Sequence, residues 1–270
     1  MRKTNSRIYM VLAFLSGCAT KLPQSSGYTA SGYGYNPLDP LPINIDTTGN
    51  RQNYRQRVLN ALPDESIRLA IGHLDYQGKI SFSTASMGYE DSSYVVILDY
   101  IKFNTQSIPV KKDDSETSSG NEDNKTVQYR RLTMKGNDTT PQALVPVYIG
   151  IGLRLTANVT VKKGAVDLGN LFGIGASGSA KQVSGTLIVQ TLGVSGQNIS
   201  AIIPMPSELN ETSVQNAIMA LATIKSHLYD STTLITPRVV GVYNNLGGGT
   251  DKVNGFITSI LKTPLSFVVP

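Results

Sequence analysis

The chain has 270 residues, a formal net charge of +5, one cysteine and no tryptophan. Three positive charges, on Arg2, Lys3 and Arg7, lie at the extreme N-terminus, so the rest of the chain carries only about +2 and gives no support to nucleic-acid binding. A single cysteine excludes an internal disulfide. The 25 glycines, with many valines, isoleucines, threonines and tyrosines, favour strands and turns over helices.

The N-terminus has the pattern of a lipoprotein signal peptide over residues 1–17. Its apolar run, 8–15, is too short to span a bilayer core, which needs roughly 20 apolar residues, but has the length of a secretory apolar region. Ser16 and Gly17 before Cys18 resemble the bacterial lipobox, so we predict cleavage between Gly17 and Cys18 and acylation of Cys18. The alternative is an ordinary secretory signal followed by an incidental cysteine.

Acylation predicts where the protein resides. Several acyl chains hold a protein on a membrane stably, whereas one chain does so only marginally. In the lipoproteins that this segment resembles, an aspartate after the cysteine retains the protein in the inner membrane. Ala19 occupies that position, so we expect lipid anchoring in the outer membrane with most of the chain in the periplasm.

Residues 18–50 predict an extended tether, because Pro37 and Pro40 oppose a regular helix or a central strand. We interpret this segment as a solvated linker; the alternative is that its tyrosines dock on a neighbouring subunit or on peptidoglycan. Residues 51–270 predict a single domain of the α+β class, β-rich, with a mixed sheet, one or two packed helices and a long β-hairpin. It begins with a short amphipathic helix over 51–62 whose arginines are expected to face water.

Two strands and a polar insertion follow. Residues 67–71 alternate as a first core strand, and 93–104 have the composition of a central strand that is covered on both sides. The charged run 111–125 predicts a flexible insertion, because its carboxylates do not have the spacing of an EF-hand calcium loop. Strand pairing is expected to resume over 126–134.

The clearest pattern predicts a long hairpin over about 145–203. Apolar and polar residues alternate over 145–161, which indicates a strand with one apolar and one polar face. The chain is expected to return over 183–194 and to pair again over 199–203. The apolar positions assigned to this hairpin are Leu153, Leu155, Val159, Val161, Phe172, Ile174, Leu187 and Val189.

Two charged residues interrupt that apolar face. Lys163 and Asp167 fall in register with it unless a bulge near Gly164 changes the register. In a membrane-inserted hairpin the lysine would cost a few kcal/mol near the bilayer midplane.

The C-terminal part predicts a helix over 214–228, a strand over 238–243 and a short helical segment over 256–261. The helix shows apolar residues at the i, i+3, i+4, i+7 spacing of a face that packs on a sheet.

No catalytic or metal-binding motif emerges. The two histidines, His73 and His227, have no partners at ligand or catalytic spacing, and the glycine-rich stretch 172–180 lacks the ending of a phosphate-binding loop. We therefore predict no enzyme activity, no catalytic residue, no metal and no cofactor.

Four stretches follow one another in the middle of the chain: 172–176, 183–194, 195–199 and 209–214. In this order they resemble the family of outer-membrane lipoproteins that forms the curli secretion channel. The resemblance covers roughly 145–230 and the N-terminus, and implies an α/β periplasmic domain that assembles into a ring, each protomer lending β-hairpins to one shared barrel. The family has a second hairpin before its C-terminal helix, where this chain has only Ser200 to Pro206.

Two functions are compatible with these features. The first is an oligomeric outer-membrane lipoprotein whose ring contributes one hairpin per protomer to a secretion or export pore. The second is a lipid-anchored periplasmic accessory or scaffold component of a secretion system, pilus or surface appendage, without a pore of its own. Both predict a homo-oligomer, contact with the outer membrane through Cys18 and other secretion or appendage components as partners, and neither predicts nucleic acid.

Overall fold

The computed structural model describes residues 34–47, 53–74, 80–83, 93–112, 129–131, 143–162, 164, 166–174, 180–246 and 250–270. The predicted signal peptide 1–17, Cys18, the tether up to residue 33, Lys163 and most of the insertion 111–125 lie outside the described residues.

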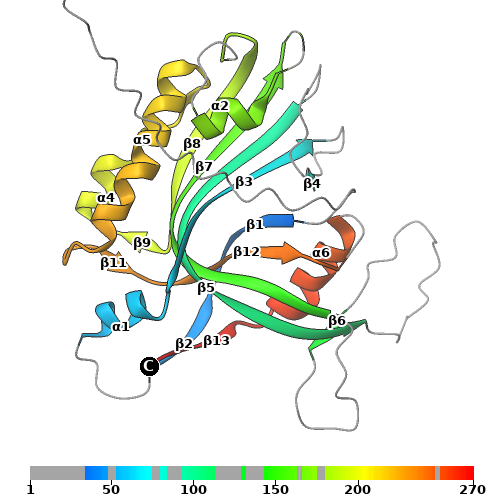
Figure 1. Cartoon of the computed structure of the whole chain (residues 1–270), viewed down its shortest axis with the longest axis vertical. Helices are drawn as coiled ribbons and strands as arrows, with labels where there is room; N and C mark the ends of the chain where they lie inside the picture. The colour runs from blue at the N-terminus through cyan, green and yellow to red at the C-terminus, as the bar shows by residue number, and fades with distance from the viewer. Residues whose placement is uncertain are drawn as a thin grey trace, which may run out of the picture.

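One antiparallel sheet organises the described part of the chain (Figure 1). Its strand order is β1-β12-β7-β5-β3-β4; β8 pairs with the other end of β7, β6 pairs with the end of β5, and β10 pairs with β8. The strands are β1 Gly34–Leu41, β3 Asp64–Leu74, β4 Ile80–Ser83, β5 Ser93–Lys112, β6 Tyr129–Arg131, β7 Ala143–Val161, β8 Val183–Leu192, β10 Ser207–Glu208 and β12 Arg238–Asn244.

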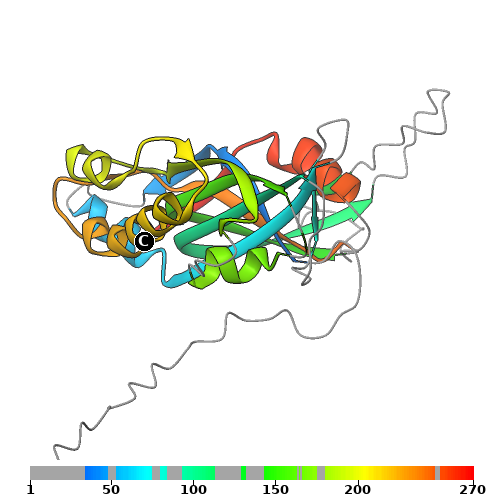
Figure 2. The same cartoon turned by 90° about the horizontal axis from the view of Figure 1, so that it is seen from above.

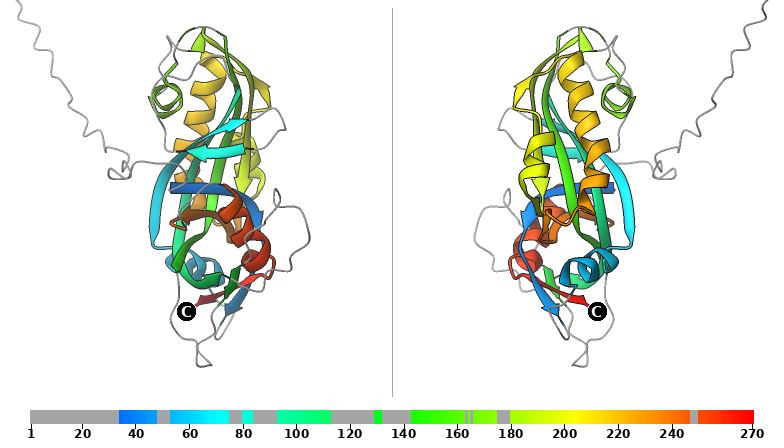
Figure 3. Two further views of the ribbon diagram at one scale, coloured as in Figure 1. Left: turned by 90° about the vertical axis from the view of Figure 1, so that its right-hand side faces the viewer. Right: turned by 90° about the vertical axis from the view of Figure 1, so that its left-hand side faces the viewer.

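Helices and two small sheets surround this sheet, which confirms the predicted α+β, β-rich class. Figures 2 and 3 show the longest helix, α5, lying along one face of the sheet. The helices are α1 Tyr54–Asn60, α2 Leu168–Ile174, α4 Gln197–Ile202, α5 Glu211–Leu228, α6 Thr250–Phe256 and the π-helix η2 Ile257–Leu261. The small sheets pair β9 Val194–Ser195 with β11 Leu234–Ile235, and β2 Ile43–Thr47 with β13 Leu265–Val269.

The pair β5–β7 is the axis of the fold. The two strands pair continuously from Ser93↔Thr160 to Val110↔Ala143, and β5 lies between β3 and β7, as its composition predicts. The alternating apolar residues of β7 face a main core that α5 covers. The predicted helix over 214–228 is confirmed as α5, which begins with a capping box formed by Asn210 and Ser213.

The β7–β8 hairpin is confirmed as an antiparallel pair from Gly152↔Leu192 to Val161↔Val183. The assignment of Phe172 and Ile174 to the hairpin is wrong, because both belong to α2. The reason is visible in the spacing: Leu168, Leu171 and Phe172 are buried at i, i+3 and i+4, which is a helical stripe.

The turn between β7 and α2 explains Asp167, one of the two charged residues that interrupt the apolar pattern. Gly164 has φ +69, the left-handed conformation that glycine tolerates best, and the strand has already ended at Val161. Asp167 then accepts a hydrogen bond from the Asn170 N–H at 2.9 Å, the bond of a helix N-cap. Asp167 therefore begins α2 rather than facing outward from a strand.

Two local expectations are wrong because contacts with distant parts of the chain decide these segments. Residues 199–203, expected to be a strand, lie in or directly after α4, where Ile199 is buried. The α1 arginines do not simply face water. Arg55 donates to the carbonyl of Leu228, the last residue of α5, and to that of Thr233, directly before β11. Arg57 donates to the Val269 carbonyl of β13 at 3.0 Å. Both bind the exposed carbonyl ends of other elements.

The predicted tether is too long, because its residues 34–47 form β1 and β2. β1 pairs with β12 and is an edge strand, a place where proline is tolerated in a sheet, and β2 pairs in parallel with β13. Lys111 and Lys112 likewise belong to β5 rather than to the insertion. The predicted strand over 126–134 is present as β6 within its described residues.

The polar face of β7 is buried in its middle rather than exposed. Gly150 and Gly152 lie on this face, and a Cβ on Gly152 would sit 1.9 Å from the Tyr100 carbonyl oxygen of β5. The glycines therefore permit a close approach of the two backbones as the sheet bends. The bend lets β1 approach β3, although the two are far apart in strand order.

We predict that Gly152→Ala lowers the free energy of unfolding by more than about 3 kcal/mol, because a paired backbone carbonyl cannot move aside as a flexible side chain can. Gly173→Ala in α2 is the matched control, since nothing lies within 4 Å of the added Cβ; it should leave the stability unchanged or raise it by up to about 1 kcal/mol. Urea unfolding of both variants measures the difference. Equal stability of the two would contradict the proposed close approach.

Candidate functional site

A second, smaller core lies behind the bend of the sheet. Its buried members come from β5, β7, β8 and β12, and Tyr35 and Tyr243 pack against them. The ring of Tyr148 contacts the edges of Tyr35 and Phe103, with centroids 5.5 and 5.2 Å apart. The Arg68 guanidinium lies over both Phe103 and Tyr148, a cation–π arrangement that closes this core from the β3 side.

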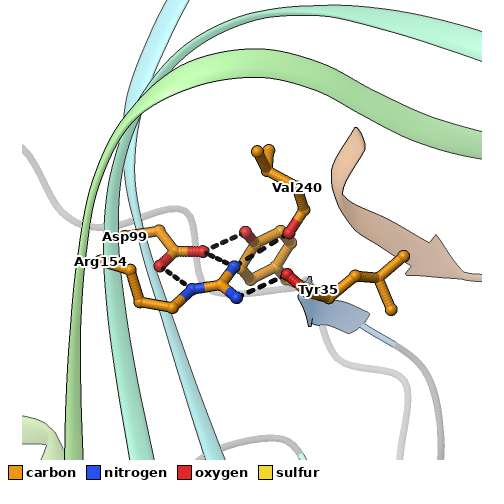
Figure 4. Close-up of polar contacts among 5 residues, drawn as sticks. Tyr35, Asp99, Arg154 and Val240 are labelled. Atoms are coloured by element: carbon orange, nitrogen blue, oxygen red, sulfur yellow. Dashed lines mark hydrogen bonds and ion pairs between the residues drawn. The ribbon is translucent and has the colours of Figure 1, made fainter. Parts of the chain in front are cut away.

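A buried ion pair lies beside this core (Figure 4). Arg154 of β7 and Asp99 of β5 are directly opposite each other in the ladder. The guanidinium donates from Nε to Asp99 Oδ1 at 2.7 Å and from Nη2 to Asp99 Oδ2 at 2.6 Å, a bidentate geometry. Both side chains are almost completely inaccessible, at 3% and 0% exposure, so neither charge is compensated by water.

Two backbone irregularities supply the other partners of Arg154. The pairing of β1 shifts register between Pro37 and Leu41, and that of β12 shifts between Val239 and Gly241. Arg154 donates to the carbonyls of Leu38, inside the first irregularity, and of Val240, inside the second, at 2.6 and 2.9 Å. The guanidinium thus binds carbonyls at both irregularities, where the ladder is interrupted.

Tyr35 completes the network from β1. Its hydroxyl donates to Asp99 Oδ2, and its ring fills the space above Gly241, where any Cβ would lie 2.4 Å from the ring. Burial raises the pKa of Tyr35 well above 10, and the negative charge of Asp99 raises it further. Burial alone would lower the pKa of Arg154, but the hydrogen bonds and charge of Asp99 outweigh it, so that this pKa is raised.

This arrangement joins the N-terminal strand to the sheet. Truncating one partner of a buried ion pair costs roughly 3–5 kcal/mol, because the other charge stays buried and unpaired. The network has no accessible face at which a substrate would meet Arg154 or Asp99. The buried network therefore serves to hold β1 in place.

An open cleft of about 910 Å³ lies at the C-terminal end of β7, beside the start of α5. Its polar lining includes Lys162, Lys181 and Asn216. Met205, which is 82% exposed, also lines the cleft. The capping box uses the Asn210 and Ser213 side chains that line the cleft, so these groups are already bonded to the helix. No described residue of the buried network lines this cleft.

The structure brings most of the predicted hairpin residues together, but on the inside. Leu153, Leu155 and Val159 are at most 1% exposed, and the others whose side chains are described are also buried. Gly17 and Cys18 lie outside the described residues. His73 lies on β3 and His227 on α5, and among the described residues no group of three His, Cys, Asp or Glu is placed to hold a metal ion. These others are Val161, Leu187 and Val189 of the hairpin and Phe172, which belongs to α2.

The sequence does not predict the buried network, although it contains two signals of it. Arg154 is the only charged residue in the alternation over 145–161, and Asp99 interrupts an apolar run in 94–103 that also holds Lys102. A charged residue in a strand that is covered on both sides needs a buried partner. The sequence does not predict the partner Tyr35, because only the long-range pairing of β1 with β12 places it beside Asp99.

Comparison of the chain with protein-family models, with curated proteins and with solved structures found no match. No helix in the described part of the chain is both long and apolar enough to cross a membrane.

We predict that Tyr35→Phe lowers the free energy of unfolding by about 1.5–3 kcal/mol near neutral pH, because it removes a hydrogen bond to a buried carboxylate. The deficit should shrink above about pH 10. There the unfolded chain ionises Tyr35 while the folded chain keeps it protonated, so only the original protein loses stability from this group. Denaturant unfolding of both proteins across this pH range measures the difference; a constant deficit would contradict the assigned burial.

Proposed function

We propose that this chain is a lipid-anchored, mostly periplasmic protein of the outer membrane that serves as an accessory or scaffold component of a secretion system, pilus or surface appendage, without a pore of its own. The observation that carries this proposal is the burial of the hairpin residues that a membrane-inserted form would present to lipid.

The hairpin and α5 bury each other. Val159 and Leu187, which would face lipid in an inserted hairpin, belong to the same core cluster as Val214, Leu221 and Ile224 of α5. Each fully buried aliphatic side chain contributes roughly 1.5–3 kcal/mol relative to exposure. Exposing the hairpin would therefore remove the packing of the longest helix, which favours a domain that keeps this face inside.

The buried network suits a domain held by its N-terminal end. β1 begins at Gly34, and the segment 19–33 between it and Cys18 can span at most about 50 Å when fully extended. Any pull on the anchor enters the domain through β1, which Arg154 and Asp99 hold by buried hydrogen bonds. A scaffold held near a membrane needs a firm connection between its anchor and its domain, and the buried hydrogen bonds to β1 supply one.

The proposed partners are further copies of this chain and other components of the secretion system or appendage. The pore-forming ring stays a prediction and is the second candidate. The antiparallel pairing of β7 with β8 favours it, because β8 has 10 residues and a strand that crosses a bilayer needs about 9–11. The pore-forming ring, however, requires α5 to move away from the sheet so that the hairpin can face lipid.

Cys18→Ser tests the anchor. We expect the variant to move from the outer-membrane fraction to the soluble periplasmic fraction, because no acyl chain can be attached, and immunoblots of both fractions measure the shift. Retention of the variant in the outer membrane would show that the protein part holds it there and would count against a lipid-dependent scaffold.

A pair of neighbouring substitutions separates scaffold from pore. Val159 is 1% exposed and its neighbour Thr160 is exposed on the opposite face. For a scaffold, Val159→Asp should unfold the domain, because it buries an unpaired charge, while Thr160→Asp should leave the melting temperature nearly unchanged. Thermal unfolding followed by circular dichroism measures both. A folded Val159→Asp domain that has lost membrane insertion and single-channel conductance would instead support the pore.

A further inference from the structure

Four polar side chains meet where the C-terminal half of α5 lies on β3 and β5. Tyr100 and Lys102 are two residues apart on β5, so both point to the same face of the sheet. Glu65 of β3 is directly opposite Lys102 in the ladder, which places its side chain on that face as well. Lys225 of α5 reaches the same place, because its Nζ lies 2.7 Å from Glu65 Oε1. We call these four residues the Glu65 cluster.

The contact between Glu65 and Lys225 is the one ion pair that joins α5 to the sheet within the described part of the chain. The lysine side chain is 60% exposed and the glutamate side chain is 27% exposed. Water therefore competes with this pair, and salt screens it. An exposed pair of this kind contributes little to stability, so its exchange for another partner costs little.

The two members of the cluster on β5 are buried without partners. Tyr100 is 5% exposed, and its hydroxyl is inaccessible to water and makes no hydrogen bond with any described residue. Lys102 is 8% exposed, and its ammonium forms no ion pair or hydrogen bond within the described residues. Buried polar groups without partners lower the stability of a fold. An arrangement that gives both groups an acceptor is therefore favoured at this position.

The Glu65 carboxylate is the acceptor within reach of both groups. The Cβ atoms of directly opposite residues are about 4.5–5.5 Å apart, so rotation of the Glu65 side chain brings its carboxylate to the Lys102 ammonium without movement of the backbone. Tyr100 is the diagonal neighbour of Glu65. Burial raises the pKa of the Tyr100 hydroxyl and the negative charge of Glu65 raises it further, so the carboxylate is near although no hydrogen bond joins the two.

We propose that Glu65 is an exchangeable clasp between α5 and the sheet. With α5 seated, Glu65 binds Lys225; when the C-terminal half of α5 moves away, Glu65 binds Lys102 and accepts a hydrogen bond from the Tyr100 hydroxyl. The exchange gives partners to two groups that the seated arrangement leaves unpaired, and so offsets part of the apolar packing that α5 loses. The clasp sets how readily the apolar face under α5 becomes accessible, and it depends neither on the lipid anchor nor on the choice between scaffold and pore.

The first test is the crystal structure of Lys225→Met. This substitution removes the α5 member of the clasp at an exposed position, so the variant should fold. We expect the Glu65 carboxylate to bind the Lys102 ammonium and to accept a hydrogen bond from the Tyr100 hydroxyl. A Glu65 side chain that points into solvent while Lys102 stays unpaired would overturn the proposal.

The second test measures the opening of α5 by amide hydrogen exchange of the purified full chain, with the paired strands β5 and β7 as the internal reference. Lys102→Met removes the partner that Glu65 gains in the open arrangement. We expect α5 to exchange more slowly than in the original chain, on the order of threefold or more beyond any change in β5 and β7. Lys262→Met, at an exposed position directly after η2, is the matched control and should leave the exchange of α5 unchanged.

A Glu65→Gln background separates the clasp from a general gain in stability. In that background Lys102→Met should no longer slow the exchange of α5 relative to the strands, because a neutral amide binds an ammonium less strongly than a carboxylate does. Equal slowing of α5 with and without Glu65, or equal slowing by Lys262→Met, would overturn the proposal. Circular dichroism confirms that each variant is folded.

Discussion

The Arg154–Asp99 pair is the constraint on which the two-sided packing of the sheet depends. A guanidinium and a carboxylate at 3% and 0% exposure are stable only if every strong hydrogen bond is satisfied. Asp99 supplies two acceptors, and the carbonyls of Leu38 and Val240 supply the others. These carbonyls belong to β1 and β12, which pair antiparallel, so the ion pair fixes the position of both strands against β5 and β7. Moving either strand would leave a buried charge unpaired.

The two faces of the sheet consequently have different roles. The first buries the alternating apolar residues of β7 under α5 and is a conventional hydrophobic core. The second holds the ion pair and the cluster around Tyr148, and there the N-terminal strand joins the domain. A first strand fastened by buried charges and a hairpin covered by its own helix are the two features on which the proposed scaffold role rests.

The elements that were predictable depend on local periodicity. The stripe from Val214 to Leu228 predicts α5, and the alternation over 145–161 predicts β7, because both patterns need only residues close in sequence. Local patterns mislead at Phe172, whose helical stripe also fits a shifted strand alternation, and at 34–47, whose prolines oppose a central strand. Whether proline is tolerated depends on whether its strand lies at an edge, which only the pairing with β12 and β13 decides.

The sequence by itself determined the strong alternation of β7, the helix α5, the α+β class and the charge pattern around residues 111–131, because these follow from side-chain spacing and composition. The tertiary structure alone decided that Arg154 would meet Asp99, Tyr35 and two backbone carbonyls. It also decided that Leu153, Val159 and Leu187 would face a helix rather than an exterior surface. The physical reason is that alternation predicts an apolar face, and only packing determines what covers that face.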